Sequence, residues 1–197
     1  MIYLLSQPAS TFGLLTYKGN NVVGIDSFSQ GVRIGPLADP LQYEAKSKAA
    51  FKKASAHQMI EVAGGPLLIG NSFRETIESI APFDVEFMAT NIRFSDQMID
   101  TFSAVNVLGV TQCVDMEKSE YEQTNFDPQN PRYMFTYTVL MEDFGREIEV
   151  TLSAEQQNQI VVSARIKDAC IDRGLRGLTF CRAIDLTYGN RSDCVSG

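Results

Sequence analysis

An acidic segment in the middle of the chain is the clearest place to look for chemistry. An apolar run from Val105 to Val114 is followed by four carboxylates, which only Lys118 offsets. These carboxylates are Asp115, Glu117, Glu120 and Glu122. Two carboxyl groups can act as general acid and general base when their surroundings separate their pKa values. Carboxylates at the end of a strand are more often solvated charges or contacts for a partner.

The sequence supplies no partner that would complete a catalytic site. His57 is the only histidine, and its candidate nucleophiles, Ser72 and Cys113, lie in no motif such as G-x-S-x-G. The glycine-rich segment 63–70 lacks the G-K-[ST] of a phosphate loop and is typical of a turn that leads into the next element. We therefore expect no catalytic residues and a surface position for His57. A small carboxylate-dependent hydrolase or transferase is kept as the alternative.

The four cysteines indicate neither a metal site nor disulfides. They form no C-x-x-C pair, and the acidic segment lacks the spacing of a calcium loop. Cys113 and Cys170 lie in apolar segments and are expected to be small buried side chains. No secretion signal or membrane span is apparent, so we expect a cytoplasmic protein with reduced cysteines, no bound metal and no cofactor.

Length and charge favour a single acidic domain. The chain has 197 residues, of which 44% are hydrophobic, and this suits one domain with one sizeable core. Its net charge is −7. Such a surface argues against nucleic acid as a direct ligand, because phosphate binding needs a basic footprint, and it would steer a basic partner. That the acidity serves only solubility stays equally open.

Element signals in the first half of the chain are uneven. We expect strands over 2–5 and 22–28, a helix over 39–57 and a helix over 73–80. Asp39 and Pro40 are good start signals for the first helix, but its poor apolar periodicity leaves a strand or loop open. The second helix is better marked, because Ser72 and Glu75 form a capping box.

The second half reads mainly as β structure. We expect strands over 83–92, 104–114, 133–142, 146–152 and 178–184, and a helix that Ser163 caps and Gly174 ends. In 83–92, Val85 and Phe87 alternate with Asp84 and Glu86, whereas 104–114 is apolar almost throughout and suits a central strand covered on both faces. The turn at 143–145 predicts a hairpin of 133–142 with 146–152, and the polar tail 187–197 is expected to fray. This pattern predicts an α+β fold with a mainly antiparallel sheet and a few short helices packed against it.

Two blocks of the chain resemble a known family. The first comprises 105–108 and 114–121, and the second comprises 160–163, the capped helix and 174–180. Together they resemble family eleven of the immunity proteins of bacterial polymorphic-toxin systems. The resemblance covers roughly 83–184 and implies a single immunity-type domain over 1–197, with a variable part over 1–70.

The resemblance implies a protein that binds and neutralises a cognate toxin and has no catalytic residues. The expected contacts are Asp115, Glu117, Glu120, Glu122, Glu142 and Asp143, with Tyr121 and Phe144 as aromatic anchors. Acidic loops would complement a basic toxin active site. For Asp115 and Ser119 we favour a local role in capping the turn after the strand. A homodimeric scaffold is a further alternative. Tyr133, Phe135 and Tyr137 share one strand face, which could serve the core or a binding surface.

Overall fold

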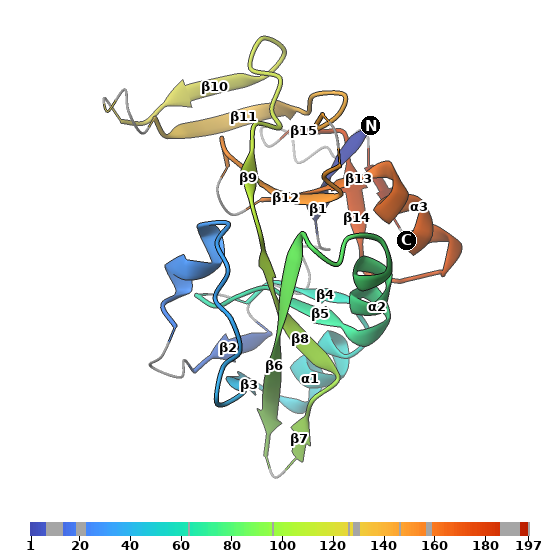
Figure 1. Cartoon of the computed structure of the whole chain (residues 1–197). Helices are drawn as coiled ribbons and strands as arrows, with labels where there is room; N and C mark the ends of the chain where they lie inside the picture. Colours follow the sequence, from blue (N-terminus) through green and yellow to red (C-terminus); the bar gives the residue numbers. More distant parts are fainter. Residues whose placement is uncertain are drawn as a thin grey trace.

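The computed structural model describes residues 1–6, 14–18, 23–62, 64–95, 97–125, 127, 131–145, 147–156, 159–185 and 194–196. Three sheets and three α-helices make up this described part, which confirms the α+β class (Figure 1). Most strand pairs are antiparallel. However, β3 (Leu41–Ala45) pairs with β6 (Val85–Phe94) in parallel, and so does β9 (Val110–Thr111) with β12 (Val150–Ser153). No helix of these residues is long and apolar enough to cross a membrane.

The largest sheet has seven strands in the order β2-β3-β6-β8-β5-β4, with β7 paired to the end of β6. Its other strands are β2 (Leu15–Tyr17), β4 (Met59–Ile60), β5 (Leu68–Gly70), β7 (Gln97–Ile99) and β8 (Phe102–Val107). Every residue of β8 is buried. Val105 and Val107 contribute to one core cluster, while Phe102 and Ala104 contribute to another. The expected central strand, covered on both faces, is therefore confirmed in β8.

Two predictions in the first half are wrong because local contacts prevail. Residues 23–28 of the predicted strand do not form one, and residue 22 lies outside the described residues. Ile25–Ser29 is a 3₁₀-helix, η2, in which the Ser29 hydroxyl donates to the Asp26 carbonyl at 2.8 Å. The helix predicted over 39–57 is replaced by β3 and the short helix α1 (Lys48–Ala54). The alternating burial of β3 explains the poor helical periodicity. Ser47, rather than Asp39, caps α1.

The helix predicted over 73–80 is confirmed as α2 (Asn71–Ile80), but its capping box is not formed. Gly70 is the N-cap residue and has no side chain to accept a hydrogen bond. Gln58 takes this role instead, because its Oε1 accepts the Phe73 N–H at 3.2 Å. The helix start is thus anchored to the segment before β4, so that Phe73 and Ile77 point into the core.

The remaining strands form two further sheets. A six-stranded sheet has the order β16-β14-β1-β13-β12-β9, and a three-stranded sheet has the order β10-β11-β15. The strands are β1 (Ile2–Ser6), β10 (Glu120–Gln123), β11 (Tyr133–Val139), β13 (Ile160–Ser163), β14 (Thr179–Cys181), β15 (Ala183–Asp185) and β16 (Cys194–Ser196). The expected strand over 2–5 is confirmed as β1, in the middle of the six-stranded sheet.

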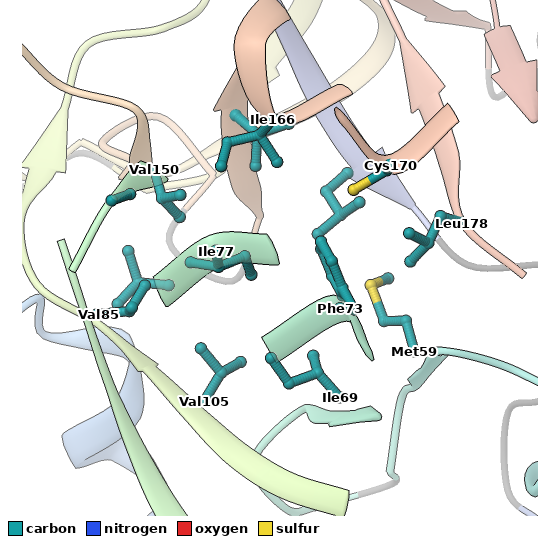
Figure 2. Close-up of a cluster of buried hydrophobic side chains, with 14 of the residues drawn as sticks. Met59, Ile69, Phe73, Ile77, Val85, Val105, Val150, Ile166, Cys170 and Leu178 are labelled. Carbon is teal, nitrogen blue, oxygen red and sulfur yellow. The ribbon is translucent and has the colours of Figure 1, made fainter. Parts of the chain in front are cut away.

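Three clusters of buried hydrophobic side chains pack against the faces of these sheets. The first, between the two large sheets, includes side chains of α2 and of α3 (Ala164–Asp172). Figure 2 shows Phe73 and Ile77 of α2 in its middle, with Ile166 and Cys170 of α3 beside them. The second cluster lies on the other face of the seven-stranded sheet and includes Ala54 of α1. The third lies between the six-stranded and three-stranded sheets.

The chain changes sheets where the sequence reads as continuous strand. The predicted strand 104–114 ends at Val107, and the chain resumes as β9 in the six-stranded sheet. Gly109, with φ of +119°, makes this break. The predicted hairpin of 133–142 with 146–152 is wrong, because β11 pairs with β10 and β15 while β12 pairs with β13 and β9.

A second change of sheet divides the predicted strand 178–184 into β14 and β15. Arg182 lies between them, and its guanidinium donates to three backbone carbonyls. The acceptors are Ile2 and Met141, both at 2.8 Å, and Leu140 at 3.3 Å. Arg182 therefore connects β1 of the six-stranded sheet to the end of β11, and fixes the small sheet on the larger one.

The C-terminal segment contradicts two expectations. Cys181 and Cys194 form a disulfide, although no disulfide was expected. Cys194–Ser196 is not a frayed tail but strand β16, which pairs with β14; the rest of the predicted tail, 187–193 and 197, lies outside the described residues. The half-cystines are cross-strand partners thirteen residues apart, a relation that spacing alone does not reveal. Cys113 and Cys170 are free and buried, as predicted.

The end of α3 shows why two glycines are needed. Ser163 caps the helix as predicted, and Gly174 ends it with φ of +62°. Gly177 has φ of +77°, and a Cβ added there would lie 2.4 Å from Nδ1 of His57. His57 is therefore not a free surface residue: it is half-buried, and its ring packs on the Gly177 backbone.

We expect the substitution Gly177→Ala to destabilise the protein more than Gly174→Ala. Both place alanine at a positive φ, which costs about 1–2 kcal/mol. At Gly177 the new methyl group also overlaps His57, which adds about 1–3 kcal/mol of overpacking, whereas nothing lies within 4 Å of a Cβ at Gly174. Urea unfolding followed by far-UV circular dichroism measures both costs.

The double variant with His57→Ala identifies the cause. If the imidazole contact is responsible, most of the excess cost of Gly177→Ala disappears in the His57→Ala background. An equal loss of stability in Gly174→Ala and Gly177→Ala would contradict the role of this contact.

Candidate binding surface

The hairpin of β10 and β11 carries the middle of the predicted contact segment. The strands pair antiparallel, with Tyr121 opposite Phe135 and Glu122 opposite Met134. Every residue of β10 is exposed, and within the described chain β10 is an edge strand that pairs with β11 alone. Figure 1 shows the hairpin at the far end of the molecule from β7. Glu120, Tyr121 and Glu122 thus lie together on one accessible strand.

Tyr121 is held in place by two other aromatic rings. Its ring centroid lies 5.2 Å from that of Tyr133 and 5.5 Å from that of Phe135. Phe135 is only 5% exposed and belongs to the third core cluster, whereas Tyr121 is 40% exposed. Of these packed rings, Phe135 therefore contributes to the core, whereas Tyr121 reaches the surface. A ring held in this way loses little rotamer freedom when a partner binds.

Asp115 and Ser119 shape the turn before β10. The Asp115 carboxylate accepts the backbone N–H of Lys118 at 3.3 Å and the Lys118 ammonium at 2.6 Å. Ser119 Oγ accepts the Val139 N–H at 2.9 Å. The hydrogen bond from the Lys118 ammonium holds the pKa of Asp115 below its ordinary value, although desolvation opposes this. Asp115 thus makes the local contacts expected of a turn cap. Ser119 instead bonds the backbone of β11, 20 residues further along the chain, and fastens the turn to that strand.

Lys118 brings three of the predicted carboxylates together. Its pKa is raised chiefly by the hydrogen bond to Asp115 and by the charge of that group, and further by the charges of Glu142 and Glu117. Glu117 and Glu142 are both exposed. The loop after β11 therefore lies near the turn before β10, although these residues are far apart in the sequence.

The loop after β11 holds the other predicted contacts. Asp143 is exposed, and its Oδ1 accepts the Gly145 N–H at 2.9 Å. Phe144 is half-buried and packs against the third cluster. Two further apolar side chains of this region are exposed and are not among the predicted contacts, Met134 (55% exposed) and Met141 (41% exposed). Alternation along the strand already places Met134 on the face opposite Tyr133 and Phe135, but only the structure shows that its face is exposed.

Most of the net charge lies in this region. Residues 115–145 contain seven carboxylates and two basic residues, Lys118 and Arg132. Their balance is −5, out of −7 for the whole chain. The acidity is therefore a local property of the turn, the hairpin and the following loop. Charge spread evenly for solubility would not be distributed in this way.

These carboxylates lack the environment that acid catalysis requires. A carboxyl group that donates a proton near neutral pH needs a raised pKa, usually through burial. The pKa of Asp115 is instead lowered, and Glu117 is exposed. Within the described chain, no three His, Cys, Asp or Glu side chains are grouped to hold a metal ion. The arrangement suits electrostatic attraction better than proton transfer.

A groove of about 760 Å³ lies elsewhere, between the segment 33–40, α2 and the start of β6. Glu86 of β6 lines it, with only 11% of its side chain exposed. Its carboxylate accepts the N–H groups of Ile34 at 2.8 Å and Gly35 at 3.1 Å, and the side-chain amide of Asn106 at 2.9 Å. The alternation of 83–92 does not anticipate this, because Glu86 reads there as an outward polar residue. Its contacts fasten the 33–40 segment to the sheet.

Comparison with known proteins identifies one matching family. The model described as Immunity protein family (Imm11) matches residues 6–185. The match runs from the end of β1 through β15, and it includes most of the first 70 residues, where the sequence itself showed no resemblance. No curated protein matches the chain.

We expect Glu86→Gln to lower stability at neutral pH by about 2–3 kcal/mol, since the amide places a donor among donors. Burial alone would raise the pKa of Glu86, but the hydrogen bonds from Ile34, Asn106 and Gly35 lower it below its ordinary value. The unfolded chain then binds the proton more readily, so this stabilisation is present above about pH 4.3, the pKa of an unfolded glutamate, and is lost as pH falls through the lower folded value.

The measurement is the free energy of unfolding of wild type minus that of E86Q, between pH 7 and pH 3. Glu75→Gln on the exposed side of α2 is the control and should give a small difference throughout. An E86Q difference that stays constant down to pH 3 would show that the charge of Glu86 is unimportant.

Proposed function

This chain belongs to the Imm11 immunity protein family, and we propose that it binds a cognate protein toxin stoichiometrically and thereby neutralises it. The observation that carries the proposal is the family match over residues 6–185. We propose further that the protein acts by contact alone, without catalysis or a cofactor. The toxin is expected to present a basic surface around its active site.

We propose that the contact surface is the acidic hairpin region, residues 115–124 and 132–144. Its net charge of −4, from six carboxylates against Lys118 and Arg132, supports this choice, because a concentrated field accelerates and orients the encounter with a basic partner. The contacts proposed there are Asp115, Glu117, Glu120, Tyr121, Glu122, Glu142, Asp143 and Phe144. Tyr121 is the best placed aromatic anchor, because it is both exposed and braced by neighbouring rings.

The charges within this region are not equivalent. Asp115 is paired with Lys118 in the turn, so we assign it chiefly to positioning. Glu117, Glu120 and Glu122 form no ion pair with another described residue, and all three are exposed, so their field extends into solvent. Such charges mainly set the association rate and its dependence on salt.

The compartment is a separate question. An immunity protein that acts where it is made would work in the cytoplasm, and this is our proposal from the sequence. The Cys181–Cys194 disulfide favours an oxidising compartment instead, because disulfides are rare in the cytosol. The proposed binding surface does not depend on the answer, since neither cysteine lies within residues 115–144.

Co-expression with the toxin encoded by the adjacent gene tests the function. We expect growth to be restored, and a complex of the two proteins to survive gel filtration at moderate salt. Toxicity that persists, together with the absence of any complex, would refute the proposal. A toxin domain with its active site inactivated serves as the binding partner in the measurements that follow.

The triple variant Glu117→Gln, Glu120→Gln and Glu122→Gln tests the surface. We expect its association rate constant with that toxin domain to fall about tenfold or more at low salt, because three steering charges are removed. The difference from wild type should shrink as salt is raised. Stopped-flow or biolayer measurements at several salt concentrations provide these rates.

A matched control removes three exposed carboxylates elsewhere, through Asp26→Asn, Glu75→Gln and Asp172→Asn. The change in net charge is the same, so only the position of the charges differs. We expect an effect of about twofold or less from this control. Equal losses in the two triple variants would mean that net charge, rather than the hairpin, attracts the toxin.

A further inference from the structure

We propose that the outer edge of β10 receives an extended strand of the toxin, in which basic and apolar side chains alternate. This inference rests on the proposed function and specifies how the toxin is held. The main support is that β10 is an exposed strand that pairs on one side only within the described chain. A strand edge of this kind offers backbone donors and acceptors to a partner strand.

The register shows which backbone groups are available. The Thr124 N–H donates to the Arg132 carbonyl at 2.8 Å, which makes Gln123–Tyr133 a non-hydrogen-bonded pair. The N–H and C=O of Gln123 therefore point away from β11. Hydrogen-bonded and non-hydrogen-bonded pairs alternate along antiparallel strands. The N–H and C=O of Tyr121 therefore also point away from β11, while those of Glu122 point toward it. The free edge thus presents two consecutive outward sites, at the spacing that a new strand requires.

The side chains of β10 define the chemistry of the incoming strand. Glu122 shares one face of the hairpin with Met134, and Tyr121 shares the other face with Phe135. A strand added beside β10 would place successive side chains next to these two faces in turn. Lysine or arginine beside Glu122, and an apolar residue beside Tyr121, would give favourable cross-strand pairs.

Charge also excludes the simplest competing occupant. Carboxylates on edge strands protect many proteins from indiscriminate strand pairing. A second copy of this chain, added at β10, would bring Glu120 and Glu122 of both copies close together, and like charges opposite one another are destabilising. The same carboxylates attract a strand of opposite charge. They therefore select the partner, by repelling a wrong strand and attracting the right one.

The substitution Gln123→Pro tests the edge directly. Proline removes the outward N–H and obstructs the approach of another strand, but it breaks no hydrogen bond to β11 and is tolerated on strand edges. The matched control, Gln123→Ala, removes the side chain and keeps the N–H. We expect Q123P to raise the dissociation constant for the inactivated toxin domain about tenfold or more, and Q123A to change it by about twofold or less.

Both variants must first be shown to fold, by circular dichroism and by thermal unfolding within a few degrees of wild type. Glu122→Pro provides a contrast, because its N–H points at β11 and its loss should destabilise the hairpin. If Q123P itself fails to fold, the outward direction of the Gln123 N–H is wrong and the proposal fails.

The outcomes separate this inference from the proposed function. If wild type neither binds nor neutralises the toxin, the function is wrong. If wild type binds and Q123P binds equally well, the toxin uses side chains alone and strand addition is wrong. If Q123A and Q123P lose the same affinity, the Gln123 side chain is the contact and strand addition is again wrong. If wild type dimerises by light scattering and Q123P abolishes the dimer, the occupant is a second copy of this chain.

Discussion

The packing of α2 against α3 between the two large sheets is the constraint on which the rest of the structure depends. Phe73, Ile77, Ile166 and Cys170 lie in one cluster with side chains from both sheets (Figure 2). Neither sheet could bury this face alone, so the cluster sets the position of each relative to the other. The six-stranded sheet then offers its second face, with Leu4 and Val161, to the third cluster. The small sheet that bears the acidic hairpin is built on that face, one layer further out.

Sequence patterns indicate burial reliably here, but they do not indicate which sheet a strand joins. Residues 104–114 are apolar almost throughout and 178–184 are mainly apolar, so the pattern predicts one strand for each. The structure divides both, at Gly109 and at Arg182, and sends the two halves to different sheets. Hydrophobic pattern cannot detect such a change, because apolar residues stand on both sides of each break. The breaks have physical causes that the pattern does not contain. Gly109 adopts a positive φ, and Arg182 contacts carbonyls of residues far away in the sequence.

The sequence predicts which residues make up the candidate site, but it does not predict the strand that arranges them. The acidic segment and the local role of Asp115 followed from residue types and spacing. β10 did not, because Glu120–Gln123 contains one apolar residue and shows no strand periodicity; its pairing with β11 makes it a strand. The part-buried carboxylate of Glu86 and the Cys181–Cys194 disulfide could not be predicted for a related reason. Each depends on a partner brought close by the fold, such as Asn106 or β16, and nothing in the nearby sequence marks that partner.

Of the residues that carry the family resemblance, 105–108 and 174–180 lie in a different layer from the proposed toxin contacts, whereas 114–121 includes several of those contacts. The separation of the first two segments from the contact surface has a physical consequence. Val105, Val107 and Leu178 belong to the first cluster, and Gly177 is required by the ring of His57. Changes at these positions would disturb packing shared by two sheets. Glu117, Glu120 and Glu122 are exposed and take no part in any core cluster of the described residues. A surface supported from beneath in this way can vary its charges and side chains at little cost in stability, because surface substitutions away from packed contacts change it only slightly. The architecture is therefore suited to holding one fold constant while the partner it recognises changes.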